Sequence, residues 1–200
     1  GVYNHLYGNV ERDLSLYNQF DFNSSSLFNL GLDYNAVLKN MNFFGEVAWS
    51  DNNAWATMHG LLMALDPRFS MSVIFRHYDK DYQSQYASGF GEGSNTSNET
   101  GLYIGLNSQL SQQWLISAFV DFYKKPWLSY QVDAPSNGVD YLAQITYEPS
   151  RALEIYVRYR HRIKEKNTKM PDGTIDNLVP VDQKNLRIHF GYKLNETFSV

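Results

Sequence analysis

Apolar and polar residues alternate along most of this chain with a period of two, the pattern of β-strands rather than helices. The clearest case is the segment 152–164. Its apolar parity holds Leu153, Ile155, Val157, Tyr159, His161 and Ile163, with His161 as the single polar exception. Its opposite parity holds Glu154, Tyr156, Arg158, Arg160, Arg162 and Lys164. Because successive side chains of a strand point to opposite sides, this segment predicts a sheet with one apolar and one polar face.

The same alternation recurs in the segments 28–36, 114–123 and 185–194, whereas 54–64 carries apolar residues on both parities. In the last of these, Ile188 and Phe190 share one parity, and Arg187 and Lys193 share the other. Together with turn residues between the segments, the pattern predicts the following strands. They are 13–22, 27–38, 42–50, 54–64, 69–78, 99–108, 113–123, 139–147, 152–164 and 185–194, with a further strand beginning at 197–200.

The connections between these segments alternate between short and longer ones. The short turns are 39–41, 66–68, 108–112, 148–150 and 195–196, and the longer connections are 51–53, 79–98, 124–138 and 165–184. Bacterial outer-membrane barrels have short periplasmic turns and longer extracellular loops, which predicts this order. A Greek-key sandwich has no reason to keep it. The expected fold is therefore all-β, an antiparallel up-and-down transmembrane β-barrel.

Strand length and aromatic residues point the same way. Many predicted strands reach about 9 to 11 residues, which is the length that crosses a bilayer at a tilt. Aromatic residues gather toward the two ends of the strands, as in the girdles of membrane barrels. Trp49, Trp55, Tyr78 and Phe122 lie toward the longer connections, and Phe43, Phe69, Trp114, Tyr147 and Tyr192 toward the short turns. A soluble or surface β-sandwich that binds carbohydrate remains the alternative, because its strands also alternate.

Composition narrows the classes of function. The 200 residues hold no run of 18 apolar residues, which excludes a transmembrane helix, and no cysteine, which excludes disulfides and thiolate chemistry. The net charge of −4 argues against nucleic acid as a partner of this segment. The chain starts at Gly1 without the features of a signal peptide, and its last residues predict the beginning of another strand. We therefore predict that residues 1–200 are a single barrel segment, about ten strands of a larger barrel truncated at both ends.

Three groups of loop residues, read in order, resemble a known family. They are Phe44-Gly45-Glu46; Phe90-Gly91-Glu92-Gly93-Ser94 with Asn98-Glu99-Thr100-Gly101-Leu102-Tyr103; and Pro126-Trp127-Leu128 with Val132-Asp133-Ala134-Pro135-Ser136-Asn137-Gly138. Their order resembles the barrel region of Bacteroidota outer-membrane proteins of the helix-hairpin-helix (ComEA-like) type, over residues 27 to 194. The resemblance implies an outer-membrane location. The helix-hairpin-helix segment itself is missing, so the resemblance implies no DNA-related role and no activity for these residues.

Charged side chains on the polar parity form the sharpest candidate site. We predict a lumen-facing stripe that consists of Arg158, Arg160, Arg162, Arg187, Lys193, Asp121, Asp140 and Glu154, and a lipid-facing set that consists of Leu153, Ile155, Val157, Ile188 and Phe190. A ladder of cations would select anions. The favoured interpretation is mutual pairing, in which Asp121, Asp140, Glu99 and Glu154 bind the cations across neighbouring strands and fill the interior.

No enzyme signature emerges, and we expect neither catalytic residues nor cofactors. His77, Asp79 and Asp81 lack a recurring ligand spacing, so no metal site is predicted. His161 and His189 lie on opposite parities, and His59 has no serine partner for a membrane-embedded hydrolase. The working hypothesis is a structural or transport component of the outer membrane. Its expected partners are outer-membrane lipid, a small solute or ion, and other envelope proteins.

Overall fold

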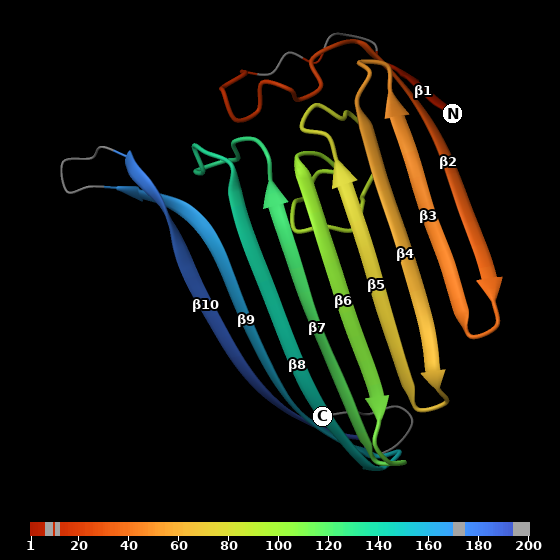
Figure 1. Ribbon diagram of the computed structural model, residues 1–200. Helices are drawn as coiled ribbons and strands as arrows, with labels where there is room; N and C mark the ends of the chain where they lie inside the picture. Colours follow the sequence, from red (N-terminus) through yellow and green to blue (C-terminus); the bar gives the residue numbers. More distant parts are fainter. Residues whose placement is uncertain (7–9, 11–12, 170–174, 194–200) are drawn as a thin grey trace.

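The computed structural model describes residues 1–6, 10, 13–169 and 175–193, and for residues 169 and 175–177 the backbone alone. These residues form one antiparallel sheet of ten strands, each hydrogen-bonded to the next strand in the sequence (Figure 1). The strands are β1 (Val2–His5), β2 (Ser26–Leu38), β3 (Met41–Ser50), β4 (Trp55–Asp66), β5 (Phe69–Tyr78), β6 (Glu99–Gln109), β7 (Trp114–Lys125), β8 (Ser136–Ser150), β9 (Leu153–Lys169) and β10 (Ile175–Tyr192). Among the described residues, no helix is long and apolar enough to cross a membrane.

The predicted all-β, up-and-down order is confirmed, and so is the alternation of short and longer connections. The turns 39–40, 67–68 and 151–152 alternate with the longer connections 79–98 and 126–135. The connection 170–174 and the strand predicted at 197–200 lie outside the described residues. Nearly every predicted strand between residues 27 and 164 is present, with ends shifted by a few residues. The period-two pattern therefore determines the sheet topology here.

Two predictions of local structure were wrong. The segment 13–22 is not a strand, because Asn18 accepts the backbone N–H of Ser15 with its side chain at 2.6 Å and organises local turns. The strand next to β2 is instead Val2–His5. The segment 165–184 is not a long loop, because β9 and β10 continue through most of it as a paired hairpin. Polar residues on both parities hide that pairing in the sequence.

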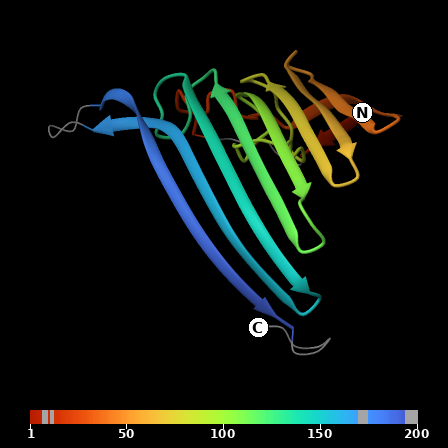
Figure 2. The same cartoon turned by 60° about the horizontal axis from the view of Figure 1, so that its bottom comes forward.

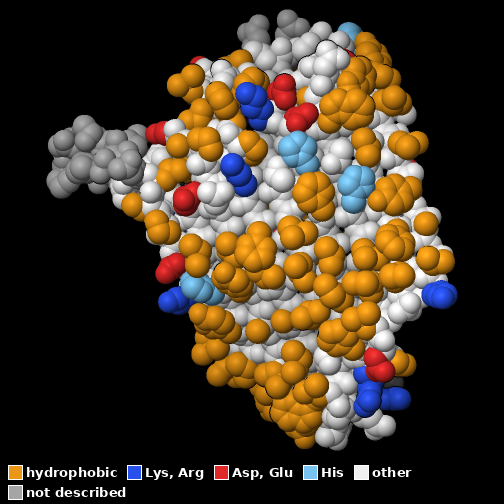
Figure 3. Space-filling model, in the orientation of Figure 1, with side chains coloured by type: hydrophobic (Ala, Val, Ile, Leu, Met, Phe, Trp, Pro, Cys, Tyr) orange, Lys and Arg blue, Asp and Glu red, His pale blue; other side chains and the backbone are white. Residues whose placement is uncertain are grey.

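The register of the strands sorts the side chains onto two faces. Directly paired residues of an antiparallel sheet point to the same side, and one such row runs through Ile74, Tyr103, Asp121, Asp140 and Arg162. We call this side the polar face. The other side, which we call the apolar face, carries rows such as Leu106, Ala118 and Ala143. Figure 3 shows this second side, where hydrophobic side chains cover the middle and much of the lower part and histidines lie higher up.

Burial is inverted relative to that of a soluble protein. On the apolar face, Leu32 is 74% exposed and Ile188 is 71% exposed. On the polar face, the side chains of Arg76 and Glu99 are almost completely buried, at 0% and 1% exposure. Water-soluble proteins bury apolar side chains and leave charged ones at the surface. This sheet does the opposite.

The long connection 79–98 covers the upper part of the polar face. The hydroxyl of Tyr78 donates to the backbone carbonyl of Phe90 at 2.9 Å, and Tyr82 packs with Tyr78 and Ala56 in a small buried cluster. Burial raises the pKa of the Tyr82 hydroxyl above its ordinary value. Figure 2 shows the sheet as an open arc, with β1 and β10 at its two edges. Among the described residues, no strand joins these two edges.

Most aromatic residues predicted to form girdles lie on the apolar face. Near the short turns, the rings of Trp114 and Tyr147 are 4.5 Å apart, and near the longer connections Phe28 and Trp49 are 6.3 Å apart. Tyr78 was misplaced by the prediction. It pairs with Ala56 and Glu99 on the polar face, where the connection 79–98 buries it.

Candidate functional site

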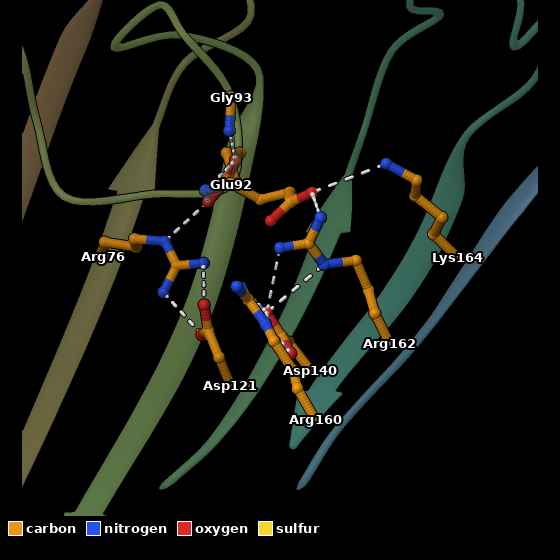
Figure 4. Close-up of polar contacts among 9 residues, drawn as sticks. Arg76, Glu92, Gly93, Asp121, Asp140, Arg160, Arg162 and Lys164 are labelled. Carbon is orange, nitrogen blue, oxygen red and sulfur yellow. Dashed lines mark hydrogen bonds and ion pairs between the residues drawn. The ribbon is translucent and has the colours of Figure 1, made fainter. Parts of the chain in front are cut away.

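The candidate site is a charged network on the polar face, centred on Arg76 of β5 (Figure 4). The Nη1 and Nη2 atoms of Arg76 donate to the two carboxylate oxygens of Asp121 at 2.8 and 3.1 Å. Its Nε atom donates to Oε1 of Glu99 at 2.6 Å. The planar guanidinium suits this geometry because it presents several donors in a fixed fork. One buried cation thus satisfies two buried carboxylates from β6 and β7.

Glu99 also holds the connection 79–98 in place. Its carboxylate accepts the backbone N–H groups of Glu92 and Gly93, each at 3.0 Å. The Phe90 ring lies 5.3 Å from the guanidinium carbon of Arg76, which adds a cation–π contact. The connection is therefore fixed to the sheet through the same residues that neutralise the buried charge.

The second half of the network centres on Asp140 of β8. Arg160 donates to both of its carboxylate oxygens, with the Nε atom at 2.9 and 3.1 Å, and Arg162 approaches it at 3.4 Å. Asp140 lies directly opposite Asp121 in the register, a placement in which like charges repel. The arginines on the outer side of each aspartate offset this repulsion.

Glu92 connects the loop to β9. Its carboxylate lies 3.9 Å from Nη1 of Arg162 and 3.7 Å from the ammonium group of Lys164. Among the described residues, the network holds equal numbers of cations and carboxylates. They are Arg76, Arg160, Arg162 and Lys164, and Glu92, Glu99, Asp121 and Asp140. Balanced charge makes this region a cross-linked structure rather than a cationic ladder.

Gly101 makes room for the guanidinium of Arg76. It is paired directly with Arg76, and a Cβ atom at this position would lie 2.4 to 2.6 Å from the guanidinium atoms. No side chain fits in that space without moving Arg76. The glycine of β6 is thus part of the site, although it carries no charge.

The structure places the predicted stripe on one face and brings only part of it together. Arg158, Arg160, Arg162, Arg187, Asp121, Asp140 and Glu154 lie on the polar face, and Lys193 follows directly after β10. Asp140 pairs with Arg160 and Arg162, as mutual pairing predicts. Glu154 is exposed and has no ion pair within the described part of the chain. That these residues face a lumen stays a prediction.

Arg158 and Arg187 lie outside the network. They are directly opposite each other on β9 and β10. Arg158 donates to Oε1 of Gln144 at 2.6 Å and lies over the ring of Tyr156. The predicted lipid-facing residues Leu153, Ile155, Val157, Ile188 and Phe190 all lie on the apolar face. Their contact with lipid stays a prediction.

Sequence reasoning missed Arg76, a fully buried residue that binds two carboxylates. Glu99 and Asp121 were expected to pair with the stripe on β9, but both bind Arg76 instead. One signal was available, because Arg76 is the only Lys, Arg, Asp or Glu in the segment 69–78 and lies on its polar parity. The contact of Glu99 with the backbone of the connection 79–98 has no counterpart in the pattern of side chains.

The histidines form no metal site. Within the described residues, no group of three His, Asp or Glu side chains could hold a metal ion. His161 and His189 point to opposite faces, as their parities predict. His77 contacts Thr100 at 2.7 Å and Asp79 at 3.2 Å, an arrangement that ties β5 to its neighbours. The absence of catalytic activity stays a prediction.

Replacement of Glu99 by Gln will loosen the connection 79–98. The amide keeps the shape of the side chain but is neutral and has an NH2 group in place of one acceptor oxygen. The N–H groups of Glu92 and Gly93 therefore lose their charged acceptor, and one oxygen can no longer serve them and Nε of Arg76 together. We expect a loss of about 1–3 kcal/mol in the free energy of unfolding. Hydrogen exchange at residues 90–93 will accelerate. Glu148→Gln, a substitution at an exposed position near a short turn, is the matched control. Unchanged exchange at residues 90–93 would show that Glu99 does not hold this connection.

Comparison with known proteins assigns the chain to no family. No protein-family model matches the chain, and neither a curated protein nor a solved structure matches it significantly. The resemblance of its loop residues to the ComEA-like barrel proteins stays a prediction.

Proposed function

We propose that this chain is a segment of a bacterial outer-membrane β-barrel, in which the apolar face contacts lipid and the polar face lines the interior. The inverted burial carries this proposal. Leu32 and Ile188 are largely exposed, whereas Arg76 and Glu99 are buried on the opposite side. A sheet whose apolar face is open gains its stabilisation from a surrounding apolar phase, and a lipid bilayer is such a phase.

The dimensions of the apolar face support a lipid contact. Trp114 and Phe122 mark the two ends of the apolar row on β7. They are eight residues apart, roughly 27 Å along a strand at about 3.4 Å per residue. At the usual tilt of about 35–45°, this row spans about 20 Å of membrane thickness. Membrane barrels carry an apolar band about 25 Å tall between their aromatic girdles.

The free edge of β10 supports a larger barrel. This 18-residue strand pairs with β9 on one side, and no described strand covers its other side. Backbone N–H and C=O groups cannot remain unpaired within a bilayer, so transmembrane sheets close into barrels. We therefore propose that the ten strands form an arc of a larger barrel, whose further strands pair with this edge.

The charged network favours a structural or gated role over a freely open pore. Arg76 and Glu99 fix the connection 79–98 across the polar face, and the ions of the network neutralise one another. An interior occupied in this way conducts little unless the connection moves. The proposal includes outer-membrane lipid as a partner, a small solute or ion as the transported species, and contacts with other envelope proteins.

A pair of neighbouring cysteine substitutions tests the orientation of the sheet, because the native chain has no cysteine. Leu106 and Asn107 are adjacent on β6, point to opposite faces and are both exposed. In bilayers, we expect a water-soluble maleimide to label Asn107→Cys but not Leu106→Cys. A fluorophore on Leu106→Cys will be quenched by brominated lipid.

Unfolded protein in the same bilayers provides the control, because both cysteines react there. Equal aqueous labelling of the two variants in the folded state would contradict the membrane proposal. A protein that stays dissolved without detergent and shows no heat-dependent shift in gel mobility would favour the soluble sandwich instead.

A further inference from the structure

A cavity of about 270 Å³ lies at the loop end of the polar face, next to the network described above, with which it shares Glu92 and Lys164. It is bounded by the connection 79–98, the connection 126–135 and the upper part of β9. Its lining includes a set of basic and hydroxyl side chains: Lys125, Lys164, Lys166, Tyr123, Ser129 and Ser136. This composition is suited to a ligand that carries several negatively charged oxygens.

The cavity has positive charge that the protein leaves unpaired. Lys125 and Lys166 form no ion pair within the described residues, and Lys164 has a single acidic neighbour, Glu92, at 3.7 Å. A second carboxylate lines the cavity, that of Glu165, and it accepts the backbone N–H of Asn137 at 2.6 Å. The lysines therefore outnumber the acids of the lining, and two of them are available to an anion.

A buried hydroxyl in the lining also lacks a partner. The side chain of Tyr123 is packed across Gly138, and the residue is 7% exposed. Its hydroxyl oxygen has no hydrogen-bond partner in the described structure. A buried polar group without a partner costs about 1–3 kcal/mol, so proteins rarely keep one without a use. A bound oxyanion would accept a hydrogen bond from this hydroxyl.

We propose that this cavity binds the phosphate group of a small solute. Lysine is a common phosphate ligand because its ammonium group acts as a point charge with three donors. Phosphate offers more acceptor oxygens than a carboxylate, which suits the two available ammonium groups of Lys125 and Lys166 together with several hydroxyls. The cavity opens on the polar face, on the side opposite the exposed apolar residues, so a dissolved solute reaches it more directly than a lipid headgroup does.

Titration of inorganic phosphate into the folded full-length chain in uncharged detergent micelles tests the proposal. Low ionic strength and a pH near 8 are appropriate, because salt screens exposed lysines and the dianion then dominates. We expect saturable binding. Tyr123→Phe and Lys166→Gln will each raise the Kd about tenfold, since a hydrogen bond to a charged group is of that size. Tyr123→Phe removes no hydrogen bond among the described residues, so it will leave the thermal stability of the free protein unchanged or higher.

Two substitutions away from the cavity serve as controls. Tyr141→Phe removes an exposed hydroxyl on the apolar face, and Lys39→Gln removes a cation at a short turn. Both will leave the Kd unchanged. Micelles that contain phosphatidic acid provide a separate arm: competition with free phosphate would identify a lipid headgroup as the source of the phosphate. Absence of saturable binding, or a Kd that neither Tyr123→Phe nor Lys166→Gln alters, would overturn the proposal. Neither result depends on whether the apolar face contacts lipid.

Discussion

Arg76→Met will lower the free energy of unfolding by about 3–5 kcal/mol, the largest effect expected from a single substitution in this chain. The arginine is fully buried and binds the carboxylates of Glu99 and Asp121. Methionine fills much of the same space but leaves both carboxylates buried without a cation. Denaturant titration of the protein folded in detergent micelles will measure the loss.

A triple variant separates the cost of unpaired charge from lost packing. When Arg76→Met is combined with Glu99→Gln and Asp121→Asn, no unpaired charge remains, and much of the lost stability should return. Arg68→Met is the control, because the ion pair of Arg68 with Asp66 is exposed and long at 3.9 Å, and such pairs contribute little. If Arg76→Met alone changed stability no more than Arg68→Met does, the network would not be a stabilising centre of the polar face.

Ala118→Arg will destabilise the protein in a bilayer by about 2–4 kcal/mol, whereas Ser117→Arg will cost at most about 1 kcal/mol. The two residues are adjacent near the middle of β7 and point to opposite faces. An arginine near the midplane on the lipid side of a barrel carries the larger cost, and an arginine on the interior side is tolerated. Here, Arg at position 117 would point toward Asn107 and Gln144, which are polar.

The free energy of unfolding of the two variants is measured by urea titration in lipid vesicles and, in parallel, in detergent micelles. The difference between the two variants should be largest in vesicles, because the apolar phase is thickest there. Equal costs for Ala118→Arg and Ser117→Arg would mean that both faces have the same surroundings, which a barrel in a membrane forbids.

The sheet was predictable from sequence because its strands obey a period of two. The segment 28–36 has one wholly apolar parity and 152–164 has one broken only by His161, and the structure pairs both as expected. The alternation of apolar and polar residues weakens where both faces of a strand lie in polar surroundings. From residue 165 to 169 both parities are polar, and the segment 175–184 has apolar residues on both parities, so these parts of β9 and β10 were interpreted as a loop although their backbones pair.

The site was predictable only in part, for a different reason. The alternation of apolar and polar residues assigns each residue to a face of the sheet. It does not show which residues of neighbouring strands lie opposite that residue. Asp140 and Arg160 were found because they lie on adjacent strands. Arg76 binds Asp121 across β6, two strands away, through a gap that Gly101 leaves open. A contact between residues two strands apart depends on the register of all three strands and on the absence of a side chain at Gly101. A local sequence pattern contains neither piece of information.

The opposition of Arg158 and Arg187 has a consequence for the edge of the sheet. Backbone groups along β10 can pair with any extended chain, so they confer no choice of neighbour. The side chain of Arg187 does make one neighbour more favourable than another. No carboxylate within the described residues balances its charge, and Arg158 of β9 lies directly opposite it. A strand that aligned an acidic residue beside Arg187 would relieve that repulsion, and one that aligned a basic residue would increase it. The exposed edge thus discriminates among incoming strands, and among registers of the same strand, by charge.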